Sequence, residues 1–190
     1  MTTTPLTTTL RNGIDTAQMY GTLDAVKGDP TLAPFEFRVR NRWIAGTHSR
    51  STIHDFWGAG AEDSSRATPF EVDASEPPVL LGHNEAPNPA EFLLHALAGC
   101  LTLTIVNVAA ARKVTLTEVS STLTGVLDAR GALGLDDNYR NGFSQIRIAF
   151  SVKGDAPAEK LQEIVERAKA RSAVYDMITN GVSVAVVTTS

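Results

Sequence analysis

A stretch of twenty mostly apolar residues, Phe92 to Ala111, limits most strongly what this chain can fold into. A helix that is apolar on every side is either the central helix of a soluble core or a membrane span, and this length fits both. His95 and Asn107 interrupt the stretch and favour the soluble interpretation. The strands and the amphipathic helix elsewhere need such a central partner. We therefore expect a core helix, and a membrane-embedded protein is the alternative.

The residues around this stretch predict where the helix begins and ends. Asn88 is a good N-cap, and Pro89 fits the first turn, where its missing N–H costs nothing. Glu91 lies in the first turn, where the helix dipole favours a carboxylate. Arg112 and Lys113 follow at the other end, where positive charge is favoured.

Upstream of this helix, the hydrophobic spacing predicts one short peripheral helix and several strands. Clean alternation of apolar and charged residues indicates a half-buried strand, and Gly46 indicates a hairpin turn after it. The expected elements are a helix over Asn12–Lys27, strands over Phe35–Trp43, Arg50–Phe56 and Phe70–Ala74, and a loop over Gly58–Ser65.

Downstream, the pattern predicts two long strands, a second long helix and a final strand. Leu161, Ile164, Val165 and Ala168 follow the spacing of an amphipathic helix. The expected elements are strands over Thr115–Leu127 and Phe143–Lys153, an irregular connection over Arg130–Gly142, a helix from Asp155 to Asn180, and a strand over Val182–Val187. Helices that stand apart from hairpin-linked strands indicate the α+β class.

Composition and missing motifs exclude several classes of function. The net charge of −4 argues against binding to nucleic acid or to an anionic membrane surface. One cysteine cannot form an intrachain disulfide, and the Thr-rich N-terminus lacks a secretory pattern, so we expect a cytoplasmic protein. No dinucleotide, phosphate-loop or serine-hydrolase motif is present, and the four histidines lack metal-ligand spacing. We expect neither a cofactor nor a metal.

The single cysteine, Cys100, lies within the apolar stretch and allows two interpretations. A free cysteine in an apolar helix is most often a small buried hydrophobe. A reactive thiol needs partial exposure and a lowered pKa. Composition alone does not decide between the two.

Two motifs favour the chemical interpretation. The first is Asn88–Leu94 followed by Ala96–Cys100, and the second is Arg171–Asp176 followed by Asn180–Val184. Together they resemble the two helix motifs of the OsmC/Ohr superfamily. The resemblance runs from about Phe35 to the C-terminus. We therefore expect an OsmC-like domain over residues 34–190, preceded by an extension with a short helix over residues 1–33.

The resemblance implies a fold and an activity. The fold would be antiparallel sheets around two long central helices in an intertwined homodimer. Catalytic members of the superfamily reduce organic hydroperoxides with a cysteine thiolate, which becomes a sulfenic acid. A second cysteine then resolves that acid into a disulfide. An arginine paired with a glutamate stabilises the thiolate.

This chain departs from the family pattern at two positions. The resolving cysteine is replaced by Ser172, and the catalytic glutamate, ten residues before Cys100, is replaced by Ala90. Glu91 is adjacent, but one residue turns a helix by about 100°, so it is badly placed to substitute. A disulfide within the chain is impossible, and an external thiol would have to complete turnover.

The remaining site residues are assigned by position. Arg50, after the Gly46 turn, is the best candidate partner for the thiolate, whereas the three arginines of the preceding strand are expected to be a solvated face: Arg38, Arg40 and Arg42. His95 lies about 140° around the helix from Cys100, so we do not expect the two side chains of one helix to pair directly. With Glu91 and Ser172, His95 and Tyr175 are candidate pocket residues.

Two functions therefore remain open from the sequence. One is a thiol-dependent peroxidase that uses Cys100, Arg50 and an external thiol, with a hydroperoxide as substrate. The other is a non-catalytic protein of the same fold that binds a small hydrophobic ligand in the dimer cleft. The loss of the second cysteine and of the glutamate motivates the second function.

Overall fold

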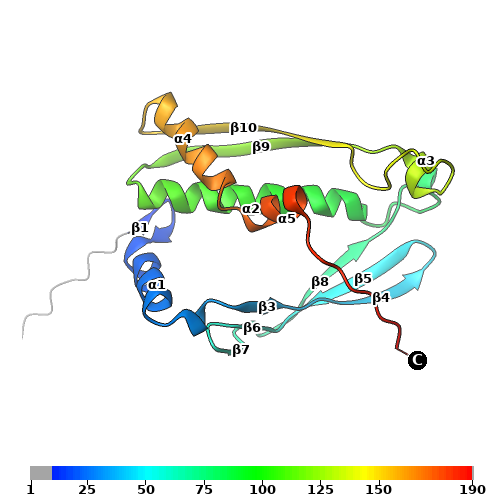
Figure 1. Cartoon of the computed structure of the whole chain (residues 1–190), viewed down its shortest axis with the longest axis horizontal. Helices are drawn as coiled ribbons and strands as arrows, with labels where there is room; N and C mark the ends of the chain where they lie inside the picture. Colours follow the sequence, from blue (N-terminus) through cyan, green and yellow to red (C-terminus); the bar gives the residue numbers. More distant parts are fainter. Residues whose placement is uncertain (1–9, 190) are drawn as a thin grey trace, which may run out of the picture. The chain divides into compact units, whose positions relative to one another are not determined.

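The computed structural model describes residues 10–189, and these residues divide into two units (Figure 1). We call residues 15–93 the sheet unit and residues 10–14 with 94–189 the helix unit. From residue 10 onward, the chain therefore runs from the helix unit into the sheet unit and returns to the helix unit within one long helix. All strand pairs described below are antiparallel, which confirms the α+β class.

A tight hairpin precedes the first helix. β1 (Leu10–Arg11) pairs with β2 (Ile14–Asp15), and Asn12 and Gly13 form the turn with φ of 53° and 80°. An Asn-Gly pair suits this left-handed turn. Helix α1 (Thr16–Gly28) therefore begins later than the predicted Asn12, at an N-cap where Asp15 Oδ1 accepts the N–H of Ala17 at 2.9 Å. None of its residues is buried, which confirms a peripheral helix.

The sheet unit contains two three-stranded sheets. One has the order β3-β6-β7, and the other has the order β4-β5-β8. The bounds are β3 (Phe35–Phe37), β4 (Arg40–Ala45), β5 (His48–Ile53), β6 (Phe56–Gly58), β7 (Ala61–Asp63) and β8 (Phe70–Ala74). Short 3-10 turns follow α1 at Pro30–Leu32 (η1) and β8 at Pro78–Leu80 (η2). The Gly46 turn and the β8 strand are confirmed.

Three expectations for this unit were wrong in detail. The strand Phe35–Trp43 is broken at residues 38–39, because β3 pairs with β6 whereas β4 pairs with β5. Phe35 and Phe37 are exposed in the chain rather than half-buried. The predicted loop Gly58–Ser65 contains β7, since Ala59 and Gly60 adopt the positive φ values of a hairpin turn.

The helix unit is built on α2 (Pro89–Ala111), which runs for 23 residues as predicted. β9 (Leu116–Val126) and β10 (Gln145–Gly154) follow it as one long hairpin, joined by a connection that holds the short helix α3 (Ala129–Ala132). Burial alternates along β10, so one face of the hairpin packs inward. Both strands lie within two residues of the predicted bounds.

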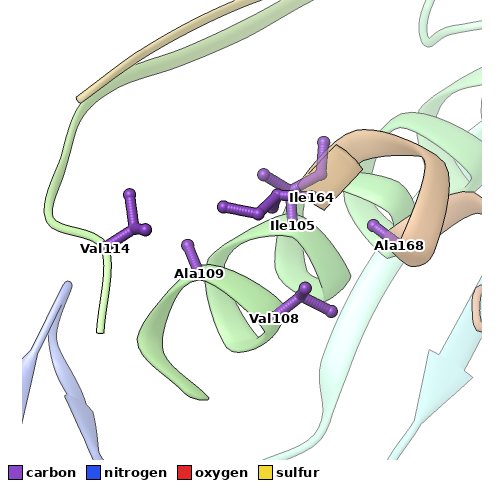
Figure 2. Close-up of a cluster of buried hydrophobic side chains, with 6 residues drawn as sticks. All are labelled: Ile105, Val108, Ala109, Val114, Ile164 and Ala168. Atoms are coloured by element: carbon purple, nitrogen blue, oxygen red, sulfur yellow. The ribbon is translucent and has the colours of Figure 1, made fainter. Parts of the chain in front are cut away.

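The core of this unit lies where α2 meets α4 (Ala158–Lys169) and the base of the hairpin. Figure 2 shows six buried side chains that come together there: Ile105, Val108, Ala109, Val114, Ile164 and Ala168. Ile105 and Ile164 have no exposed surface, and burying such a side chain contributes about 1.5–3 kcal/mol. The apolar stretch thus serves as a core helix on this face.

The second long helix is interrupted, contrary to the prediction of one helix to Asn180. α4 ends at Lys169, and a separate helix α5 runs over Ala173–Asn180. Ser172 causes the break, because its side chain accepts the N–H of Tyr175 and caps α5 instead of continuing α4. The amphipathic pattern crosses the break and therefore did not reveal it.

The predicted final strand over Val182–Val187 is absent from the described part of the chain. Residues 181–189 have no helix or strand assignment. Four valines of this segment are largely exposed: Val182, Val184, Val186 and Val187. The β-branched pattern predicted a strand, but a strand also needs a neighbour to pair with.

The side chain of Asn12 fixes the first described residues to the start of β9, because it both donates to and accepts from the backbone there. Asn12 Nδ2 donates to the carbonyl of Val114 at 2.9 Å, and Asn12 Oδ1 accepts the N–H of Leu116 at 2.8 Å. Arg11 Nη1 donates to the carbonyl of Lys113 at 3.1 Å. These bonds tie residues 11–12 to the start of β9.

Candidate functional site

Cys100 is the twelfth residue of α2 and is a free, partly buried thiol. Leu97 and Leu101 flank it and are only 2% and 3% exposed, so the backbone is held firmly at this point. Cys100 itself is only partly buried. This partial exposure satisfies one requirement of a reactive cysteine.

The hydroxyl of Ser172 contacts this sulfur. Ser172 Oγ donates to Cys100 Sγ at 3.1 Å, although 72 positions separate the two residues. Ser172 itself is 2% exposed. The structure therefore brings together two residues that the sequence motifs placed at one site, and it shows that the second contributes a hydroxyl at the sulfur.

Tyr175 joins the same arrangement through its backbone. Its N–H donates to Ser172 Oγ at 3.3 Å, which makes Ser172 the N-cap of α5. The Tyr175 side chain is half-buried, and its role as a pocket residue stays a prediction. His95 is exposed on α2, five residues before Cys100, and its role also stays a prediction.

Glu91 is committed to the start of α2. Its Oε2 accepts the N–H of Asn88 at 2.8 Å, while Asn88 Oδ1 accepts the N–H groups of Ala90 at 2.7 Å and Glu91 at 3.3 Å. This reciprocal pair is a capping box, which satisfies N–H groups that have no partner inside the helix. Glu91 thus has a structural role at the start of α2, and its role as a pocket residue stays a prediction.

Arg50 lies in the sheet unit and is held by Asp73. The two residues are directly opposite in β5 and β8, with Nε–Oδ1 at 2.6 Å and Nη2–Oδ2 at 2.8 Å. This bidentate pair raises the pKa of Arg50 and holds the pKa of Asp73 well below its ordinary value. Glu71 adds a weaker contact, with its Oε2 3.5 Å from Nη1. The pairing of Arg50 with the Cys100 thiolate stays a prediction.

Sequence reasoning missed Asp73. It lies in a strand that was predicted correctly, so the available signal was an acidic residue in Phe70–Ala74. What the sequence could not supply was the register that sets Asp73 opposite Arg50. Asp73 therefore provides a carboxylate partner for Arg50. The glutamate that the family pattern has ten residues before Cys100 is replaced by Ala90 in this chain.

Two of the three arginines expected to form a solvated face take part in ion pairs, and of these Arg40 is exposed whereas Arg38 is partly buried. Arg38 contacts Asp55 and Glu62 at 3.0 and 2.8 Å, and it also reaches Glu36. Arg40 contacts Asp55 at 2.8 Å. These pairs connect residues 38–40 with the β5–β6 connection at Asp55 and with β7 at Glu62, so they link separate strands of the sheet unit.

Within residues 10–189, no three side chains of histidine, cysteine, aspartate or glutamate gather in a way that could hold a metal ion. α2 is long and apolar enough to cross a membrane, and 28% of its most apolar window is buried within the chain. Such a helix is weak evidence for a membrane span, because core helices meet the same criterion.

The fold and the helix-borne cysteine define a class of α+β proteins, and the comparisons with known proteins specify it. The family model for OsmC-like proteins matches residues 82–187, which include α2, the hairpin and both later helices. The chain therefore belongs to the OsmC-like protein family, as the two motifs indicated. Proteins of this family are generally soluble. A comparison with curated proteins gave no match.

Solved structures support the same fold. An OsmC-like protein from Mycoplasma pneumoniae has a TM-score of 0.55 at 15% identity, with 75% of this chain and 86% of that chain covered. An organic hydroperoxide resistance protein OsmC from Legionella pneumophila has a TM-score of 0.51 at 18% identity, with 76% and 91% covered. At these identities the likeness establishes the fold, not the activity.

Proposed function

We propose that this protein is a thiol-dependent hydroperoxide reductase that uses Cys100 as its nucleophile and an external thiol as its reductant. The observation that carries the proposal is the partly buried free thiol on α2, with its sulfur 3.1 Å from a hydroxyl donor. Family membership and the hydroperoxide resistance described for the Legionella protein support the choice of substrate.

The reaction would proceed in two stages. The Cys100 thiolate attacks the terminal oxygen of the hydroperoxide, the O–O bond breaks, and the departing alkoxide takes up a proton to leave as an alcohol. Cys100 is now a sulfenic acid. One external thiol displaces water to form a mixed disulfide, and a second external thiol releases Cys100 as an external disulfide forms.

Arg50 and a homodimer complete the proposal. A cation near the sulfur would favour the thiolate, and Arg50 is the residue that we assign to this role. The exposed valines of residues 182–187 are one apolar segment that a second copy would cover. We place the OsmC-like domain at residues 34–190, with residues 1–33 as an extension, in the cytoplasm, where reducing thiols are available.

The test is oxidation of the reduced protein with one equivalent of cumene hydroperoxide. We expect an adduct of about 16 Da on Cys100, trapped by a sulfenic-acid reagent and removed by excess thiol. The Cys100→Ser variant should gain no mass. Arg50→Ala should slow adduct formation about tenfold or more, because an opposite charge near a thiol shifts its pKa by about one unit or more.

A non-catalytic protein that binds a small hydrophobic ligand is the second candidate. The observation that favours it is the strong engagement of Arg50 by Asp73, together with the absence of a second cysteine. Unchanged Cys100 after excess peroxide would reject the peroxidase. An apolar compound that raised the melting temperature would then support ligand binding.

A further inference from the structure

We propose that Ser172 is a positioning residue that links the N-terminal end of α5 to the sulfur and thereby favours the thiolate form of Cys100. The proposal deepens the proposed function and rests on it for its biological meaning. The ionisation of Cys100 can nevertheless be measured without any peroxide. The proposal also gives a role to Ser172, whose hydroxyl replaces the thiol of the second cysteine in the family pattern.

The hydroxyl of Ser172 makes two hydrogen bonds, one as a donor and one as an acceptor. Ser172 Oγ donates to Cys100 Sγ, with the oxygen and the sulfur 3.1 Å apart, and the same oxygen accepts the N–H of Tyr175 at 3.3 Å. The residue is 2% exposed and adopts the extended backbone of an N-cap, with φ of −79° and ψ of 115°. The hydroxyl is therefore fixed between the sulfur and the first turn of α5.

This arrangement favours the charged form of the sulfur. A thiol is a weak acceptor, whereas a hydrogen bond to an ionised acceptor is about twice as strong as one between neutral groups. The N–H of Tyr175 polarises the hydroxyl from the other side and carries the positive end of the α5 dipole. The stabilisation by the Ser172 hydroxyl therefore acts mainly on the thiolate form of Cys100.

α2 itself cannot provide this effect. Cys100 is its twelfth residue, and the favourable influence of a helix N-terminus falls off within the first turn. The nearby hydroxyl of Thr104 is also unsuitable, because it donates to the carbonyl oxygen of Cys100 at 2.7 Å and not to the sulfur. Thr104 thus offers a matched control: a hydroxyl close to Cys100 that lacks the proposed contact.

The experiment follows the rate of Cys100 alkylation by iodoacetamide against pH in the full chain. We compare the wild type with Ser172→Ala, Ser172→Thr and Thr104→Val. Removing the Ser172 hydroxyl should raise the midpoint of the profile, so that about tenfold less thiolate is present at neutral pH, since hydrogen bonds to the charged form favour it. Ser172→Thr should restore the wild-type midpoint, and Thr104→Val should leave it unchanged.

The direction of the midpoint change distinguishes ionisation from access, because a newly opened cavity that admits water raises the plateau rate and solvates the thiolate, which lowers the midpoint instead of raising it. Ser172→Gly provides a second test if Ser172→Ala unfolds, since glycine is a tolerable N-cap that lacks the donor. Equal midpoints in the wild type and in a folded Ser172→Ala or Ser172→Gly variant would overturn the proposal. A raised midpoint without any peroxide reaction would reject the proposed function and leave this inference standing.

Discussion

At the scale of single residues, the chemistry of this protein depends on which atom faces Cys100 Sγ. A hydroxyl can hold the sulfur and can orient it, but it cannot form a bond to it. Any sulfenic acid formed on Cys100 would therefore have no partner in position 172, and its lifetime would depend on thiols from outside the chain.

We predict that Ser172→Cys changes the product of oxidation. The side-chain atoms of residues 100 and 172 are already 3.1 Å apart, so two sulfurs at these positions need only a small adjustment to bond. One equivalent of peroxide should then give a mass loss of about 2 Da and a linked peptide pair, where the wild type gains about 16 Da. Intact mass and peptide mapping under non-reducing conditions measure this.

Ser172→Ala is the control for that prediction, because it removes the hydroxyl without adding a second thiol. It should give no linked peptide. A Ser172→Cys protein that folds and still accumulates a stable sulfenic acid would show that the two side chains do not meet in solution.

At the scale of elements, the break between β3 and β4 is stabilised by charge. Asp55 lies between two guanidinium groups, and its hydrogen bonds to Arg40 and then Arg38 hold its pKa well below the ordinary value of 3.8. A carboxylate with a depressed pKa contributes stability at pH values above its unfolded pKa. That contribution is lost as the pH falls below about 3.8 toward the folded pKa.

We therefore predict that Asp55→Asn melts at a lower temperature than the wild type near neutral pH. The gap should narrow by about half as the pH drops from about 5 to about 2.5, because Asp55 of the unfolded wild type then takes up a proton whereas the folded state keeps the charge. Thermal unfolding followed by circular dichroism at several pH values measures the gap. Asp137→Asn, at an exposed loop position, is the control and should show no such narrowing. A gap that is constant with pH would contradict the ion-pair explanation.

The elements also show how far sequence patterns reach. α2, β8, β9 and β10 were predicted well, because each combines a clear hydrophobic period with good boundary residues. The helix start predicted at Asn12 and the loop predicted over residues 58–65 were wrong because residues 12–13 and 59–60 adopt positive φ and form tight hairpin turns. Hydrophobic spacing does not report such turns. The helix break at Ser172 depended on a capping bond, which periodicity does not report.

The sequence predicted the parts of the candidate site that lie in the two family motifs, but not the contacts of the other site residues. Cys100 lies in a helix that the sequence located and Ser172 caps another, and both belong to the two family motifs, so their meeting followed from the family resemblance. The bidentate contact of Arg50 with Asp73 and the capping role of Glu91 depend on register and on side-chain bonds. Hydrophobic periodicity contains neither kind of information.

At the scale of the whole molecule, the exposed valines of residues 182–187 argue for association. Val184 and Val186 are 76% and 87% exposed, in a β-branched segment without a strand partner in the described chain. Such a segment is suited to pairing with the edge of another copy. We predict a dimer with twice the mass of the 20.3 kDa chain by light scattering coupled to size-exclusion chromatography.

Val184→Lys with Val186→Lys should shift the protein to the mass of one chain, because two charges would have to be buried at the interface. Leu133→Lys, at an exposed apolar position in the connection after β9, is the matched control and should remain a dimer. A wild type that elutes as a single chain would remove the homodimer from the proposal.

The hydrogen bonds of Asn12 to Val114 and Leu116 have a consequence for proteolysis. Because residues 11–12 are bonded to residues 113–116, the sheet unit is a loop of chain with both ends fastened to the same body. A protease that nicks the segment between α1 and β3 would separate the backbone into two pieces without releasing the smaller one. The short fragment should copurify with the large one under native conditions and part from it only in denaturant.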